Sequence, residues 1–243
     1  MTAAQLTLIT LLLLGMSATG HAQGIKVVTE DTSYSYLQDG KVVGTATEIV
    51  EATLQRAGLN DYSVSLYPWA RAYDMALQEK NVLIYLIART PERETRFKWV
   101  GEVERIDYPM YKLRERTDIQ VRDLQEAKHY SIGVVRDDVR HQYLKEQGFT
   151  KLVVSANNRD NFQRLLNQQV QLIPMPESDV AMQCQDAHFD CALLEKTFTP
   201  ELTTNLYMAY SLGTDDEIVA RTREAFDNLK TDGTVQQLIH GDN

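Results

Sequence analysis

The sequence contains none of the short motifs that mark the common enzyme classes. It has no G-x-S-x-G, no P-loop, no G-x-G-x-x-G and no H-E-x-x-H. Histidine is scarce after residue 22, and no histidine has a partner at an obvious catalytic spacing; these residues are His129, His141, His188 and His240. We therefore expect no catalytic residues, metal or cofactor, and a protein that is not an enzyme.

Long apolar runs are absent outside the N-terminus. The apolar run Leu6–Met16 (LTLITLLLLGM) precedes small residues that end at Ala22, a pattern typical of a signal peptide. The run is too short for a membrane span, which needs about 20 residues. Residues 1–5 carry no Lys or Arg, so a retained N-terminal anchor stays open as an alternative. We expect cleavage after residue 22 and a periplasmic protein.

Basic residues are outnumbered by acidic ones. The chain has 25 Lys and Arg against 34 Asp and Glu, a net charge of −9. Nucleic acid and anionic membranes attract basic surfaces, so neither is expected as the main partner. The net charge does not name a ligand. We expect a monomer.

Cysteine is limited to Cys184 and Cys191. In an exported protein the simplest interpretation is one disulfide. Seven residues of α-helix would separate the two Cα atoms by about 10 Å, too far for a disulfide, so a non-helical turn must lie between them. The alternative is a metal site that also uses Asp186, His188 and Asp190, although the spacing matches no zinc pattern.

Short apolar runs alternate with segments of helical period. Residues 82–87 (VLIYLI) are continuously apolar, as expected of a strand buried on both faces. Thr214 and Glu217 have the spacing of a capping box. The predicted strands are 25–29, 62–66, 82–87, 129–135, 151–154, 170–173 and 206–210, and the predicted helices are 46–57, 69–79, 139–147, 161–167, one from 214 and one over 235–239.

This alternation predicts two α/β lobes, each a mostly parallel sheet flanked by helices. A weakly periodic stretch with Pro109 is interpreted as the first crossover between them, and the strand at 206–210 as the return. We expect residues 23–108 and 208–243 to form lobe 1, and residues 109–207 to form an inserted lobe 2.

The most informative segment follows the buried strand at 82–87. The chain there runs directly into Ala88-Arg89-Thr90-Pro91-Glu92-Arg93. Ligands of open α/β sheets gather at the carboxyl ends of strands, and an arginine there can bind a carboxylate with two hydrogen bonds. The alternative is that Arg89 and Arg93 pair with Glu92 or Glu94 on the surface.

Several blocks, taken in order, resemble the family 3 extracellular solute-binding proteins, the amino-acid-binding components of ABC transporters. The blocks cover nearly all of the mature chain; they are Val28-Thr29-Glu30-Asp31 with Tyr34-Ser35-Tyr36, Asp39-Gly40 to Gly44 with the helix to Gly58, Thr90-Pro91-Glu92-Arg93, Ser131-Ile132-Gly133-Val134, and Leu229 to Gly233 with Ile239. The resemblance implies a Venus-flytrap fold of the periplasmic binding protein type II kind, with the ligand between the lobes.

The resemblance also implies ligand-binding residues. Arg93 stands where the family has the arginine that holds an α-carboxylate, and Thr90 belongs to the same turn. Tyr34 and Tyr36 match the aromatic loop that packs on the ligand. Ala88 stands where the family usually has a hydroxyl or a glycine.

Lobe 2 departs further from the family pattern. Arg136-Asp137-Asp138 replaces the usual Gly-Thr turn, and Pro176 stands where the family has the aspartate for the ligand's amino group. Asp137, Asp138 or Glu177 could substitute for that aspartate, or the ligand is not an ordinary α-amino acid.

Trp69 and Arg71 each allow two interpretations. Trp69 is either a core residue or a ring that stacks on the ligand. Arg71, close to the start of the same predicted helix, is either a second anion contact or half of a surface ion pair.

Capture of a small polar, carboxylate-bearing ligand for ABC-type uptake is the function that the resemblance favours. A ligand sensor of the same fold, signalling to a membrane receptor, is the second hypothesis. A dehydratase acting on cyclohexadienyl substrates is the third, because the same fold is known to host one; it would need an acid over the leaving group, and Glu177 or the pair Asp137 and Asp138 would have to supply it.

Overall fold

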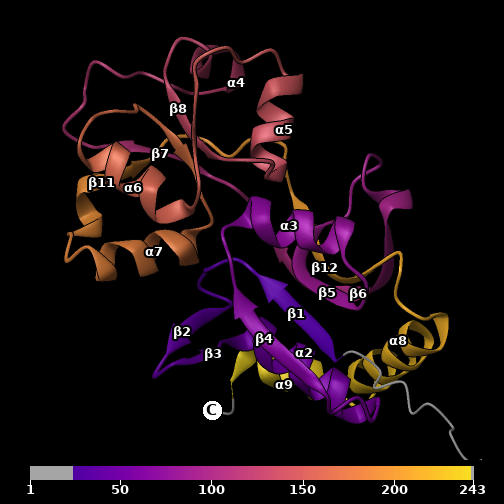
Figure 1. Ribbon diagram of the computed structural model, residues 1–243. Helices are drawn as coiled ribbons and strands as arrows, with labels where there is room; N and C mark the ends of the chain where they lie inside the picture. Colours follow the sequence, from indigo (N-terminus) through magenta and orange to yellow (C-terminus); the bar gives the residue numbers. More distant parts are fainter. Residues whose placement is uncertain (1–23, 242–243) are drawn as a thin grey trace, which may run out of the picture.

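A computed structural model describes residues 24–241 of the chain. The predicted signal peptide, residues 1–22, lies outside the described residues. The described chain forms two groups of helices and strands, one containing β1, β5 and α8 and the other containing β7, β8 and α4 to α7 (Figure 1). Among these residues, no helix is both long enough and apolar enough to span a bilayer.

Lobe 1 is built on a five-stranded sheet with the order β4-β1-β5-β12-β6. Strands β1, β4 and β5 pair in parallel, and β12 pairs antiparallel with both β5 and β6. Every residue of β5 is buried, which confirms the interpretation of its apolar run. The strands are β1 (Ile25–Thr29), β4 (Tyr62–Leu66), β5 (Val82–Ala88), β6 (Phe97–Ile106) and β12 (Thr204–Ser211).

Helices cover both faces of this sheet. One core contains Ile49, Leu54 and Phe226 from helices packed against Leu83 and Tyr85 of β5. The core on the opposite face contains side chains of α3 packed against alternate residues of β5. Burying each large apolar side chain stabilises the fold by about 1.5–3 kcal/mol. The helices are α2 (Thr45–Arg56), α3 (Trp69–Gln78), α8 (Asp216–Thr231) and α9 (Thr234–His240).

A β-bulge interrupts β5 at Leu86. Tyr207 pairs with Ile87 and Met208 pairs with Tyr85, so Leu86 is the extra residue, and its φ is 58°. The bulge turns Leu86 to the same face as Tyr85, where it lines the space between the lobes. Positive φ in a branched residue costs free energy, and such strain is concentrated at functional sites.

Lobe 2 combines two small sheets. Strand β7 (Met110–Leu113) pairs antiparallel with β10 (Ile173–Pro174) and with β11 (Leu194–Lys196). Strands β8 (Ile132–Val135) and β9 (Leu152–Ser155) pair in parallel, and Leu172 adds a parallel bridge to Ile132. The mixed α/β fold is confirmed, with antiparallel pairs at β7 and β12 added to the expected parallel ones. The helices are α4 (Leu124–Ala127), α5 (Val139–Glu146), α6 (Asn158–Leu166) and α7 (Glu177–Asp186).

The chain passes between the lobes twice, from β6 to β7 and from β11 to β12. The expected boundary at 108/109 lies between β6 and β7, and that at 207/208 lies inside β12, which belongs to the lobe 1 sheet from Thr204 onward. The exact division of the chain stays a prediction.

Smaller elements complete the two lobes. A hairpin of β2 (Tyr36–Gln38) and β3 (Lys41–Val43) follows β1, and two short 3-10 helices are η1 (Glu94–Arg96) and η2 (Cys191–Leu193). The predicted capping box at Thr214 is wrong: Asp215 caps α8, and its side chain accepts a hydrogen bond from the Glu217 N–H.

Cys184 and Cys191 form the predicted disulfide. Helix α7 ends at Asp186, and the chain turns at His188, whose φ is 50°. This turn brings the two Cα atoms to 5.7 Å, the separation that a straight helix would not allow. The cysteines are therefore not metal ligands, and among residues 24–241 no group of His, Cys, Asp and Glu is arranged to hold a metal ion.

Candidate functional site

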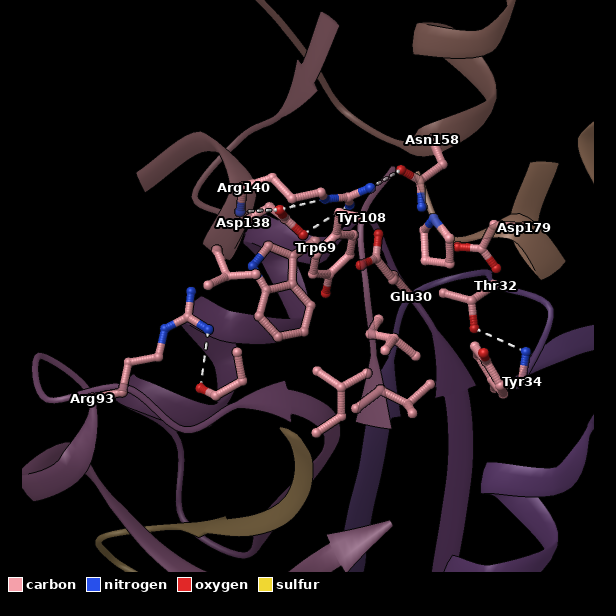
Figure 2. Close-up of a pocket in the computed structure, with 16 residues that line it drawn as sticks. Glu30, Thr32, Tyr34, Trp69, Arg93, Tyr108, Asp138, Arg140, Asn158 and Asp179 are labelled. Atoms are coloured by element: carbon pink, nitrogen blue, oxygen red, sulfur yellow. Dashed lines mark hydrogen bonds and ion pairs between the residues drawn. The ribbon is translucent and has the colours of Figure 1, made fainter. Parts of the chain in front are cut away.

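The candidate site lies where the two lobes meet. Lobe 1 contributes the end of β1, the loop after it and the end of β5; lobe 2 contributes the starts of α5, α6 and α7 (Figure 2). The lobes are closed on each other, and the space left between them is about 30 Å³. A cavity of that size holds a water molecule or two and no amino acid.

Arg93 is a fully buried cation, with 1% of its surface exposed. Its guanidinium lies 5.0 Å from the ring centre of Tyr73 and 5.6 Å from that of Trp69. It donates to the Ala88 carbonyl in its own lobe (3.3 Å) and, across the cleft, to the Asp137 carbonyl (3.0 Å). The Nε–H of Arg93 has no partner, so one N–H donor of the guanidinium is left for a ligand.

Trp69 also reaches across the cleft. Its indole N–H donates to the Asp137 carbonyl over 3.0 Å, the same oxygen that Arg93 contacts. Asp137 adopts a positive φ of 59°, and its carbonyl is the acceptor that both lobe 1 side chains share. Trp69 is therefore both a core residue, 3% exposed, and a residue of the cleft.

Asp138 and Arg140 form a buried ion pair at the start of α5. Asp138 caps the helix and accepts two hydrogen bonds from the Arg140 guanidinium, at 2.7 and 2.9 Å. Arg140 also donates to Asn158 and to the Pro174 carbonyl, both at 3.1 Å. Burial alone would raise the pKa of Asp138, but the adjoining Arg140 charge holds it below its ordinary value.

Glu30, the residue after β1, lies opposite this pair. It is 9% exposed, and its Oε2 has no hydrogen-bond partner. Burial, with repulsion from Asp138, raises the pKa of Glu30 to about 8. The Glu30 carboxyl is therefore protonated at neutral pH in this closed arrangement.

The loop after β1 is bonded to helix α7 of lobe 2. Asp179 accepts hydrogen bonds from the Ser33 N–H (2.8 Å) and the Ser33 hydroxyl (2.7 Å). Burial nevertheless raises the pKa of Asp179 above its ordinary value. Ser178 donates to the Tyr34 hydroxyl over 3.1 Å, so two neighbouring residues of α7 hold the Tyr34 loop.

The structure brings some of the predicted residues into the cleft and leaves others outside. Arg93, Tyr34, Ala88 and Trp69 line the space between the lobes, and Asp137 contributes its carbonyl oxygen. Glu177 lies at the mouth of the cleft, where it pairs with Lys196.

The remaining predicted residues do not line that space. Arg71 is exposed and lies 4.5 Å from the ring centre of Tyr67. Tyr36 faces a separate surface hollow beside α7, and Thr90 lies in the turn that positions Arg93 through its carbonyl. Arg89 is the arginine that pairs with Glu94 on the surface.

The sequence alone assigns no ligand role to several residues that line the cleft; these are Glu30, Tyr108, Arg140, Asn158 and Asp179. Glu30 carried a usable signal, because it follows the first strand at its carboxyl end, where ligands gather. Asp138 was only one of several candidates, although an aspartate before a helix is a common cap. Asp179 carried no local signal, since its partner Ser33 lies in a distant segment. Nothing near Arg140 predicted that its pair with Asp138 would be buried in the cleft.

The chain has the two-lobed fold of the periplasmic binding proteins. It is similar to a histidine kinase sensor domain that itself resembles periplasmic binding proteins (TM-score 0.80, 16% identity, 90% of this chain and 95% of that chain covered). It is also similar to an ancestral arginine-binding protein bound to arginine (TM-score 0.77, 16% identity, 90% and 97% covered). A further match is an ancestral amino-acid-binding protein described as a precursor of cyclohexadienyl dehydratase (TM-score 0.73, 15% identity, 90% and 94% covered).

These identities show the fold alone. No protein-family model matches the sequence. No curated protein matches it at a significant level.

Proposed function

We propose that this chain is a periplasmic solute-binding protein of the family 3 type, which captures a small polar, carboxylate-bearing ligand between its lobes for ABC-type uptake. The observation that carries the proposal is the set of direct bonds across the cleft, from Trp69 and Arg93 to the Asp137 carbonyl and from Ser33 to Asp179. Such bonds make a closed state that must open to admit a ligand.

Arg93 is the proposed carboxylate ligand. Its contact with the Asp137 carbonyl lies across the cleft, so opening of the lobes releases that donor while the Ala88 contact and the aromatic rings keep the guanidinium in place. The released donor and the free Nε–H form a fork suited to a carboxylate. Tyr34, Trp69, Ala88 and Asp137 are the proposed neighbours of the ligand.

A sensory role is the second candidate. The similarity to a kinase sensor domain supports it, because in such a role closure is read by a membrane receptor rather than by a permease. Both roles need the same closure, in which binding energy shifts an open–closed equilibrium.

A dehydratase is the third candidate, and Glu30 is the observation in its favour. A buried carboxylic acid that keeps its proton at neutral pH is a suitable general acid. Turnover of prephenate or arogenate by the purified protein would move this candidate to first place.

The test is a thermal-shift screen of the purified protein with the standard amino acids, small dicarboxylates and polyamines. A ligand that binds only the folded state raises Tm by mass action. We expect a shift with one class of carboxylate-bearing compound. The absence of a shift with every compound would contradict uptake of such a solute.

A further inference from the structure

Closure gathers acidic groups around Glu30 from both lobes. Asp138 from the start of α5 and Asp179 from α7 approach it across the cleft, and Asp31 lies next to it in its own loop. Arg140 is the cation that faces it. The titratable and charged groups around the Glu30 carboxyl are therefore Asp31, Tyr108, Asp138, Arg140 and Asp179.

Arg140 lowers the pKa of Glu30 but makes no hydrogen bond to its carboxyl group, so it offsets the charge of Glu30 only in part. Its Nε and Nη2 donate to Asp138, and its Nη1 donates to Asn158 and to the Pro174 carbonyl. The guanidinium therefore neutralises Asp138 and satisfies lobe 2 acceptors, while Glu30 Oε2 remains without a partner. An ionised carboxylate buried in that way is costly, and binding a proton removes the cost.

We propose that the ligand-free lobes close over a proton bound to Glu30, so that the open–closed equilibrium of this protein depends on pH. The proposal rests on the lobe closure of the proposed function and describes its regulation. In the open state Glu30 lies apart from Asp138 and Asp179 and is exposed to water. Its pKa then falls toward the ordinary value, and the carboxyl group releases the proton.

The direction of the dependence follows from the shift at Glu30. Its pKa is raised from an ordinary 4.5 to about 8 in the closed state. A raised pKa means that the closed state binds the proton more tightly, so this contribution to closure is complete below about pH 4.5 and is lost as the pH rises to about 8. Within that window the ratio of closed to open protein falls about tenfold per pH unit for one proton.

Two other carboxyls act in the same direction. The pKa values of Asp179 and Asp31 are raised by burial, so each also favours closure in acid. The pKa of Asp138 is lowered by Arg140, but both residues lie at the start of α5, so opening of the lobes does not separate this pair. The substitution Glu30→Gln separates the effect of Glu30 from these three, because the amide keeps the shape and does not ionise.

The test is small-angle X-ray scattering of the purified, ligand-free protein between pH 5.5 and pH 9. We expect the radius of gyration of the wild type to increase with pH, and the closed fraction of E30Q to change much less over the same range. Glu48→Gln, an exposed carboxylate on α2, is the matched control and should behave as the wild type. Circular dichroism of each variant checks the fold, and Asp179→Asn is the second variant if E30Q does not fold; it should reduce the pH dependence in part.

A radius of gyration that is independent of pH in the wild type, or equally dependent on pH in E30Q, would overturn the proposal. Failure of the proposed function has a different signature. If no compound shifts Tm but the radius of gyration still changes with pH through Glu30, the proposal of proton-linked closure is supported and the proposed uptake function is refuted. If a ligand binds and the radius of gyration of the ligand-free protein does not change with pH, only the proposal of proton-linked closure is refuted.

Discussion

The indole N–H of Trp69 donates to the carbonyl of Asp137 over 3.0 Å, which joins a side chain of one lobe to the backbone of the other. Arg93 donates to the same oxygen. One carbonyl on lobe 2 therefore receives two lobe 1 donors, and the closed state is held by contacts that a ligand must replace or rearrange.

Trp69→Phe should shift the protein toward the open state. The change keeps an aromatic ring in the core and removes the cross-lobe hydrogen bond, which contributes about 0.5–1.5 kcal/mol, a factor of roughly 2 to 10 in the closed-to-open ratio. Scattering at pH 5.5 measures the radius of gyration. Trp99→Phe is the matched control, because the Trp99 indole N–H donates to the Glu94 carbonyl within lobe 1. An equal expansion in both variants would show that the Trp69 bond has no special part in closure.

Arg93→Ala should weaken binding of the ligand found in the thermal-shift screen by at least about tenfold, because the ligand carboxylate is left without its charged donor. Isothermal titration calorimetry measures the affinity. Arg89→Ala removes a neighbouring arginine that pairs with Glu94 on the surface, and it should bind normally. Unchanged affinity in R93A would refute the assignment of Arg93.

Arg140→Met should be strongly destabilising. It leaves the Asp138 carboxylate buried without its partner, and breaking a buried pair in this way costs about 3–5 kcal/mol. Urea unfolding measures the free energy of unfolding. Arg56→Met removes one half of an exposed pair with Asp232 and should cost less than about 1 kcal/mol. Similar losses in the two variants would mean that burial of the Arg140 pair contributes little.

Acid should weaken the same ion pair. The pKa of Asp138 is held below its ordinary 3.8, so its stabilisation is present above that pH and is lost as the pH falls through the lowered value. Urea unfolding of wild type and of Asp138→Asn at pH 6, 4 and 3 measures the effect. The cost of D138N should shrink toward pH 3; a constant cost across the series would contradict this account of the pair.

Removal of the disulfide should lower stability without affecting the cleft. The double variant Cys184→Ser/Cys191→Ser should lose about 2–3 kcal/mol, the closure entropy of a short loop. Urea unfolding with and without reductant measures it. Reductant should destabilise the wild type by a similar amount and leave the double variant unchanged, and a wild type that is indifferent to reductant would exclude a stabilising disulfide.

The α/β class and several elements were readable in the sequence because their signals are local. The apolar run of β5 identified a strand buried on both faces, and the spacing of Cys184 and Cys191 required a turn between them. The position after this buried strand predicted an arginine at the cleft without separating Arg93 from Arg89, and the resemblance to the Thr-x-x-Arg turn of the family pointed to Arg93, which lines the cleft. The residues that predict the strand and the turn lie within a few positions of the structure that they predict.

The composition of the cleft was decided by tertiary structure. Ser33 donates a hydrogen bond to Asp179, although 146 positions of sequence separate them, and no local pattern predicts such a contact. The bulge that turns Leu86 into the cleft depends on its pairing with β12, a strand that returns from the far end of the chain. The pKa of the Glu30 carboxyl is raised by burial and by Asp138 of lobe 2, and both causes come from the tertiary structure rather than from the residues beside Glu30.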